Sequence, residues 1–212
     1  MNNSYSNEHW RKKIQSYLSE EWSTQPSPFA KQVAGTFKSG GKILELGTGA
    51  GQDGIWFEEQ GFEVVLSDGN TDAFDTIQQK SIKLTRPVQF DLTQEFPFED
   101  SSFDVVYAQL VLHYFDDKTM DHIMMEIYRV LSSQGILAFM VNTVNDTEYL
   151  AAKVDDSGII KTNKLLKRYF SVETLAPFVI NFTPILFDNQ GRTPKDDAVG
   201  NAGMVQFVGV KR

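Results

Sequence analysis

The most constraining feature of the sequence is a set of alternating glycines directly after a short apolar run. Ile43 to Leu46 has the pattern of a buried strand, and Gly47, Gly49 and Gly51 follow it before a helical pattern resumes near Ile55. Glycines at alternate positions let the backbone adopt positive φ angles and let a ligand lie against the main chain. The helix that follows would direct free N–H groups and the positive end of its dipole into the same space. The sequence therefore predicts a nucleotide-like ligand at this turn.

The spacing of the glycines narrows the choice of nucleotide. A dinucleotide fingerprint requires Gly-x-Gly-x-x-Gly, but Gln52 occupies the third required position. The turn also lacks the Gly-Lys-Ser/Thr of a phosphate-binding P-loop. An acid, Asp68, ends the next apolar run, Val64 to Ser67, where a carboxylate can accept both hydroxyls of a ribose. What remains is Glu-x-Gly-x-Gly-x-Gly followed by a candidate ribose-binding acid.

These residues resemble a known family. Glu45 to Gly51 is similar to motif I of the class I S-adenosylmethionine-dependent methyltransferases, and Asp68 is similar to the acid of the next motif. Three later segments resemble further motifs of the family in the expected order: Asp91-Leu92, Phe96 to Val106, and Leu131 to Leu137. They correspond to the third-strand acid near the adenine and to the segments that lead into the fourth and fifth strands. Because five signals follow in order over residues 41 to 142, the resemblance is specific.

The resemblance implies S-adenosylmethionine as cofactor and a set of residues that bind it. The cofactor-binding residues would be Glu45, Gly47, Thr48, Gly49, Gly51, Asp68, Gly69, Asn70, Asp91, Leu92 and Gln109. Four of them fall at or just beyond the ends of expected strands, where parallel α/β sheets bind ligands: Glu45, Asp68, Asp91 and Gln109. The alternative for the glycines is tight packing of strand against helix, and the alternative for Asp91 is a turn cap.

His113 and Tyr114 are the candidate catalytic residues. They follow the fourth expected strand, where the family often places residues that face the substrate, and imidazole can accept a proton near neutral pH. The alternative for His113, which lies between Leu112 and Tyr114, is a hydrogen-bonded packing residue. Methyl transfer from a sulfonium is an in-line displacement, so it needs a general base only if the nucleophile arrives protonated. This segment lacks the Asn-Pro-Pro-Tyr or Asp-Pro-Pro-Tyr of enzymes that methylate amino groups of DNA or protein glutamine, which disfavours those substrates.

Alternating strands and helices predict an α/β fold of the doubly wound, Rossmann-like kind, with helices on both faces of the sheet. The resemblance adds a mostly parallel, seven-stranded sheet with an antiparallel C-terminal strand. Strands are expected at residues 43–46, 62–67, 83–90, 103–108, 136–141, 182–187 and 204–210. Helices are expected at residues 8–21, 29–37, 51–60, 71–81, 119–131 and 172–178, with Gly61 as a left-handed C-cap and a surface loop over 188–203.

The length of 212 residues suits a single methyltransferase domain. Its expected parts are a helical segment at 1–40, which is either a lid over the site or a brace, a cofactor-binding core at 41–142, and a substrate-side insertion with the closing strand pair at 143–212. Aromatic residues expected to line the acceptor pocket or to pack in the core are Trp10, Tyr17, Trp22, Tyr114, Tyr149 and Tyr169.

Composition excludes several other classes of protein. The chain has no cysteine, which excludes disulfides and thiolate chemistry, and its three histidines are too scattered to suggest a metal site. A formal net charge of −8 argues against nucleic acid as a partner. With no long apolar run and a polar start, the chain is expected to be cytoplasmic, with no membrane partner. The sequence leaves the oligomeric state open.

The predicted function is methyl transfer from S-adenosylmethionine to a small-molecule acceptor by in-line displacement. Two alternatives remain. The first is a non-catalytic module on the same fold that binds the cofactor or a partner protein. The second is an NAD-dependent oxidoreductase, in which an acid such as Asp68 would also bind a ribose. Against this alternative, Gln52 of this chain stands where the dinucleotide fingerprint requires a glycine.

Overall fold

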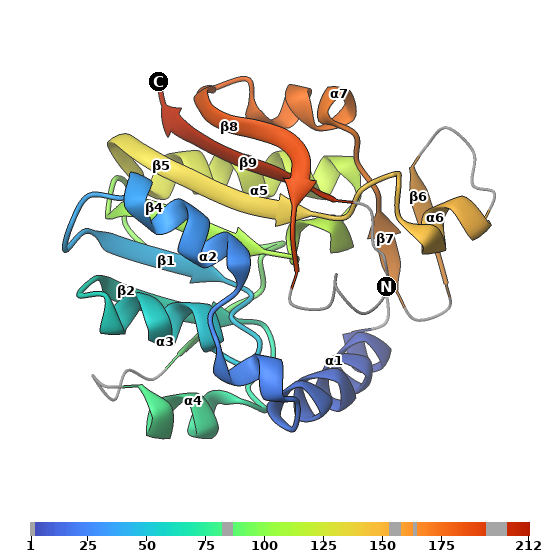
Figure 1. Cartoon of the computed structure of the whole chain (residues 1–212), viewed down its shortest axis with the longest axis horizontal. Helices are drawn as coiled ribbons and strands as arrows, with labels where there is room; N and C mark the ends of the chain where they lie inside the picture. Colours follow the sequence, from blue (N-terminus) through green and yellow to red (C-terminus); the bar gives the residue numbers. More distant parts are fainter. Residues whose placement is uncertain (1–2, 82–86, 153–157, 163–164, 194–202) are drawn as a thin grey trace.

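The computed structural model describes residues 3–81, 87–152, 158–162, 165–193 and 203–212. A seven-stranded sheet forms the centre of the molecule, with strand order β3-β2-β1-β4-β5-β9-β8 (Figure 1). The strands are β1 (Lys42–Leu46), β2 (Glu63–Asp68), β3 (Val88–Gln89), β4 (Phe103–Gln109), β5 (Leu131–Val141), β8 (Phe182–Gly191) and β9 (Met204–Lys211). Strands β1 to β5 are joined in parallel, and β9 is antiparallel to both β5 and β8. The predicted fold class is confirmed.

Alternation along the central strands places apolar side chains on both faces of the sheet. In β1, Ile43 belongs to one buried cluster, whereas Leu44 and Leu46 belong to the other. Val105 and Val106 of β4 divide between the same two clusters. A strand covered on both faces is rich in apolar residues, which explains why the apolar runs at Ile43 to Leu46, interrupted only by Glu45, and at Val105-Val106 identified these two strands.

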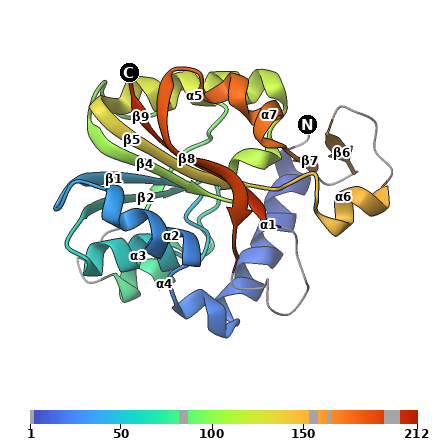
Figure 2. The same ribbon diagram turned by 45° about the horizontal axis from the view of Figure 1, so that its top comes forward.

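The two buried clusters are completed by helices on opposite faces (Figure 2). One face carries α2 (Pro28–Val33), α3 (Gln52–Glu59) and α4 (Phe74–Lys80), and the other carries α5 (Asp117–Val130) and α7 (Val172–Leu175). The N-terminal helix α1 (Asn3–Leu18) stands at the end of the sheet toward which β1 and β4 point. In the part of the chain that the structure describes, no helix combines the length and apolar character needed to cross a membrane.

Capping residues explain where several helices begin and end. Ser27 accepts a hydrogen bond from the Ala30 amide and starts α2, and Asp116 accepts one from the Thr119 amide and starts α5 two residues earlier than predicted. Gly61, with φ of +93°, follows the end of α3, as the sequence indicated. Short 3-10 turns continue or follow some helices: η1 (Glu21–Thr24), η2 (Ala34–Thr36), η3 (Leu112–Tyr114) and η4 (Ala176–Val179).

Several parts of the chain differ from the expected elements. Strand β8 continues to Gly191, so the loop expected to begin at residue 188 begins later. Strand β5 begins at Leu131 instead of residue 136, because Leu131 already pairs with Phe103. The third strand contains only Val88 and Gln89, and most of its expected start, residues 83–86, lies outside the described residues, as does 194–202 of the expected loop. The substrate-side insertion contains α6 (Thr147–Ala152) and a separate two-stranded sheet of β6 (Ile159–Lys161) and β7 (Leu166–Arg168), which the sequence did not indicate.

Candidate functional site

A cavity of about 1230 Å³ lies at the carboxyl ends of the parallel strands. It is larger than the roughly 300–1,000 Å³ of a typical site for one small ligand. The predicted site residues that line it are Glu45, Gly47, Thr48, Gly49, Asp68, Gly69, Asn70, Asp91, Leu92, Gln109, His113 and Tyr114. Only Gly51, among the predicted residues, is missing from the lining. The fold therefore brings twelve residues from the ends of separate strands to one hollow.

The three glycines of the turn all have positive φ, but their surroundings differ. A Cβ at Gly47 would lie 2.6 Å from a methyl group of Val111, and one at Gly51 would lie 2.8 Å from Ile77. A Cβ at Gly49 would meet no atom within 4 Å. Gly47 and Gly51 thus permit close packing, which was the alternative considered for the glycines. Gly49 is the position where the backbone is open to a ligand.

Asp68 lies at the end of β2, and backbone amides hold its carboxylate in place. One oxygen accepts a hydrogen bond from the Gly49 amide at 3.0 Å, and the other accepts one from the Asn70 amide at 2.9 Å. Burial raises the pKa of Asp68, and the amides of Asn70, Gly49 and Gly69 oppose that rise. A carboxylate offers about four lone-pair positions, so each oxygen can still accept a hydroxyl donor.

Two buried acids lie beside the glycine turn. The Thr48 hydroxyl donates to Glu45 at 2.6 Å, and burial, together with the neighbouring charge of Asp53, raises the pKa of Glu45. Asp53 accepts hydrogen bonds from the Ser27 amide at 2.6 Å, the Ser27 hydroxyl at 2.8 Å and the Tyr107 hydroxyl at 2.7 Å. Both acids line the cavity. Sequence reasoning missed Asp53, although an acid in the first turn after a glycine loop was the available signal.

The segment after β4 changes direction sharply at Leu110. This residue has φ of +54°, and its amide donates to the Met140 carbonyl at 2.9 Å. A non-glycine residue in this region is strained, and such strain tends to occur at functional sites. The turn brings Val111 against Gly47 and leads into η3, which carries His113 and Tyr114. The strained turn therefore positions both candidate catalytic residues.

His113 is buried, with 2% of its surface exposed, and it lines the cavity. Its Nδ1 atom has no hydrogen-bond partner among the described residues. Burial, reinforced by the charges of Lys167 and Lys13, lowers the pKa of His113 to about 3. The imidazole is therefore neutral near pH 7, and it is a weaker base than its ordinary pKa indicated.

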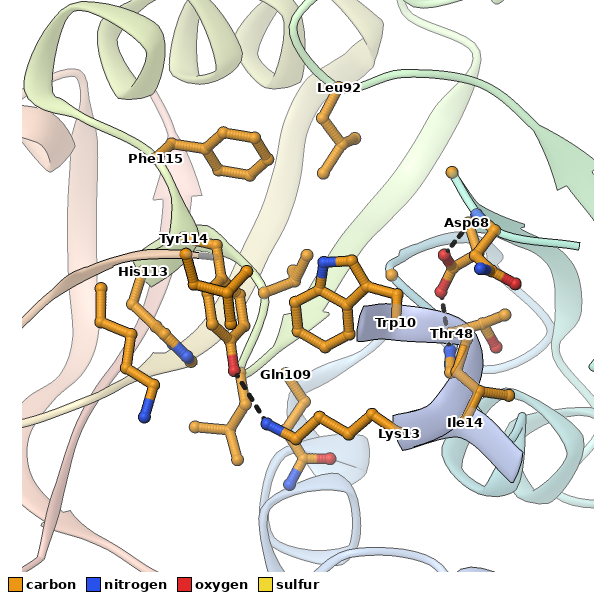
Figure 3. A pocket seen from close by; sticks show the side chains of 18 of the residues that line it. Trp10, Lys13, Ile14, Thr48, Asp68, Leu92, Gln109, His113, Tyr114 and Phe115 are labelled. Carbon is orange, nitrogen blue, oxygen red and sulfur yellow. Dashed lines mark hydrogen bonds between the residues drawn. The ribbon is translucent and has the colours of Figure 1, made fainter. Parts of the chain in front are cut away.

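Helix α1 forms one wall of the cavity. Trp10, Lys13, Ile14 and Tyr17 line it from this helix, and the Trp10 ring packs edge-on against Tyr114 at 4.7 Å between centroids. Figure 3 shows the Trp10 indole standing between the Tyr114 side and the Asp68 side of the hollow, with Leu92 and Phe115 beyond it. Ile14 is buried in the core as well, so the helix both braces the sheet and covers the site.

Asp91 makes the turn cap that was considered as the alternative to cofactor binding, and it also lies at the cavity. Its carboxylate accepts a hydrogen bond from the Thr93 amide at 2.9 Å, which is the turn cap, and the exposed residue also lines the cavity beside Leu92.

The residues that the structure describes contain no group of three or more acids or histidines able to hold a metal ion.

Known proteins are similar to this chain over the segment that contains most of the predicted site residues. Residues 44–139 match the model of a methyltransferase domain, and this segment contains the glycine turn, Asp68 and His113. An uncharacterised methyltransferase of Synechocystis sp. is 30% identical over 101 residues, which is 48% of this chain and 47% of the relative. The match thus spans about half the length of that relative. Residues 44–139 of the chain are therefore similar to methyltransferase domains, as the glycine turn and Asp68 indicated.

Solved structures of methyltransferases share the whole fold. The 1,6-didemethyltoxoflavin-N1-methyltransferase of Burkholderia thailandensis, solved with 1,6-didemethyltoxoflavin and S-adenosylhomocysteine, has a TM-score of 0.72 at 18% identity. That likeness covers 100% of this chain and 90% of the other. A methyltransferase of Methanosarcina mazei has a TM-score of 0.70 at 18% identity and covers 85% of this chain and 96% of its own.

The residues that line the cavity fit S-adenosylmethionine, the cofactor of the proteins that this chain resembles. Asp68 has unused lone pairs for the ribose hydroxyls, and Gly49 leaves the backbone open beside it. Glu45 and Asp53 line the same end, where their carboxyl oxygens can accept hydrogen bonds from the ammonium of the methionine part.

Proposed function

We propose that this protein is a methyltransferase that transfers a methyl group from S-adenosylmethionine to a small-molecule acceptor by in-line displacement. The observation that supports the proposal most strongly is the size of a single cavity that joins the Asp68 end to the His113 end. At about 1230 Å³ it exceeds the volume of a typical site for one ligand, so it has room for a cofactor and a second molecule together.

The acceptor end favours a small organic molecule over a polymer. Helix α1 covers the cavity, and aromatic side chains from α1 and η3 line it. The net charge of −8 disfavours nucleic acid. A structural neighbour described with a bound small heterocycle, the enzyme from Burkholderia thailandensis, is consistent with such an acceptor.

S-adenosylmethionine supplies an electrophilic methyl group on a sulfonium, whose sulfur keeps the bonding electron pair and becomes a neutral thioether. The chain's own contribution is to hold the acceptor in line with that methyl group and to exclude water, which supplies much of the acceleration. Within this proposal Tyr114 shapes the acceptor pocket as a neutral phenol, because burial raises its pKa. His113 hydrogen-bonds the acceptor as a neutral imidazole. A proton on the nucleophile, when there is one, leaves to water.

The proposal is tested by measuring S-adenosylhomocysteine release with a panel of small hydroxyl, amine and thiol compounds. We expect release that depends on at least one class of acceptor. If the protein binds S-adenosylmethionine but releases product with none of them, the non-catalytic binding module becomes the better account. Release only with tRNA or protein as acceptor would instead contradict the small-molecule substrate.

Replacing His113 by glutamine should lower turnover with such an acceptor by about tenfold, the effect of a lost hydrogen bond. The affinity for S-adenosylmethionine should change less than about twofold. Because the pKa of His113 is lowered to about 3, the wild-type pH profile of kcat/KM should show no inflection from this residue between pH 5 and 8.

The matched control is His122→Gln, which removes a histidine of α5 that does not line the cavity. A loss of more than about a hundredfold, with an inflection in the wild-type profile that disappears in the His113 variant, would instead assign a general base. Equal losses of turnover and cofactor affinity would indicate a packing role.

A further inference from the structure

The acceptor end of the cavity contains a lysine that the sequence patterns did not indicate. Lys13 extends from α1 toward η3, and its ammonium donates a hydrogen bond to the Tyr114 hydroxyl at 3.5 Å (Figure 3). The two residues are 101 positions apart in the sequence, so the contact joins the N-terminal helix to the segment after β4. Lys13 is half-buried and lines the cavity.

Aromatic rings hold the Lys13 ammonium in place. Its Nζ atom lies 5.4 Å from the Trp10 ring centroid and 6.0 Å from the centroids of Tyr17 and Tyr114. Cation–π attraction operates over these distances, and it favours one position of an otherwise flexible side chain. An ammonium carries three N–H donors, and the Tyr114 hydroxyl accepts one of them. The cavity wall therefore includes a positive charge at a defined point.

His113 gives the same region a second polar group. Its Nδ1 atom is buried and has no hydrogen-bond partner among the described residues. The imidazole as a whole lines the cavity, so it is a second polar group on the cavity wall. The charge of Lys13 also contributes to the lowered pKa of His113, which places the two side chains within each other's electric field.

Other charged side chains line the cavity as well: Asp116, Asp146, Glu148, Lys161 and Lys167. Lys167 forms an ion pair with Glu148, and Asp146 accepts a hydrogen bond from the Glu148 amide at 2.7 Å at the start of α6. Aromatic rings of this kind can also bind a cationic ligand, but the Lys13 ammonium already lies over them. A second cation there would be repelled.

We propose that the acceptor carries an anionic oxygen, as in a carboxylate, and that Lys13 is the residue that recognises it, with His113 as a further hydrogen-bonding partner of the acceptor. This inference rests on the proposed function, because it names the chemical class of the molecule methylated at the same site. Lys13 is thereby a specificity-determining residue.

The test uses three probes that share one ring and differ in charge: benzoate, benzamide and benzylamine. Each is titrated calorimetrically into the full-length protein saturated with S-adenosylhomocysteine at pH 7. Wild type should bind benzoate about tenfold more tightly than benzamide, with benzylamine the weakest, because a charge-assisted contact is stronger than a neutral one. Lys13→Met should reduce benzoate binding to the level of benzamide, and Lys13→Arg should restore most of the preference.

The matched control is Lys12→Met, which removes an equal charge from the exposed face of the same helix, where Lys12 pairs with Glu8. It should behave as wild type. Absence of S-adenosylhomocysteine binding in wild type would contradict the proposed function itself. If S-adenosylhomocysteine binds, the inference on Lys13 is overturned by any of three results: benzoate binds no better than benzamide, none of the probes binds, or Lys13→Met keeps the preference.

Discussion

Replacing Asp68 by alanine should weaken the binding of S-adenosylmethionine by about a hundredfold or more while the domain stays folded. The reason is the loss of two hydrogen bonds from ribose hydroxyls to a charged acceptor, each contributing about 1.5–3 kcal/mol. Alanine also leaves the Gly49 and Asn70 amides without the partner that fixes the turn. Isothermal titration calorimetry measures the affinity, and urea unfolding measures the stability.

The stability of this variant follows from the direction of the pKa shift. Burial raises the pKa of Asp68, so the ionised carboxylate is held less favourably in the folded chain than in the unfolded chain at neutral pH. Removing the charge therefore costs no electrostatic stability, and only the two amide hydrogen bonds are lost. The control is Asp72→Ala, which removes an exposed acid of the same loop that pairs with Arg11 at 3.6 Å. Unchanged affinity in the Asp68 variant would remove the basis for the ribose assignment.

Gly49→Ala should lower the affinity for S-adenosylmethionine by about tenfold or more, equivalent to at least about 1.4 kcal/mol. The added methyl group meets no protein atom within 4 Å, so it would occupy space at the cavity wall where the cofactor approaches the backbone. Because φ is +55° at this position, alanine should also cost about 1–2 kcal/mol of folding free energy. Calorimetry and urea unfolding separate the two effects.

Gly61→Ala is the matched control for that experiment. Gly61 also has a positive φ, +93°, and a Cβ there also meets nothing within 4 Å, but the residue follows α3 away from the cavity. Alanine should cost a similar amount of stability at both positions, whereas only the Gly49 variant should lose affinity. Equal affinities of the two variants would show that Gly49 does not contact the cofactor.

The parts of the fold that the sequence predicted well are those with a strong local pattern. The apolar runs of β1 and β4 identified strands covered on both faces, and Gly61 marked the end of α3. Helix and strand ends were less accurate, because contacts between elements decide them. The pairing of Leu131 with Phe103 is an example, since no local pattern indicates it. The small sheet of β6 and β7 has short, mixed strands that carry no clear periodicity.

The candidate site was predictable where one short motif supplies both a residue and its position. The glycine turn and Asp68 are of this kind, and in the fold the Gly49 amide donates a hydrogen bond to Asp68. Asp53 and Lys13 were missed because their importance depends on distant partners. The buried Asp53 accepts hydrogen bonds from Ser27 and Tyr107, and Lys13 of the N-terminal helix donates one to Tyr114. Neither contact leaves a periodic signal in the sequence.

The most direct test of this account is parallel calorimetric titration of the purified protein with S-adenosylmethionine, S-adenosylhomocysteine and NAD. The arrangement of Gly49, Asp68 and the buried acids predicts that both adenosyl compounds bind with a stoichiometry of about one and that NAD does not, because Gln52 replaces the third glycine of a dinucleotide turn. Binding of NAD, or failure of both adenosyl compounds to bind, would contradict the assignment of this cavity to S-adenosylmethionine.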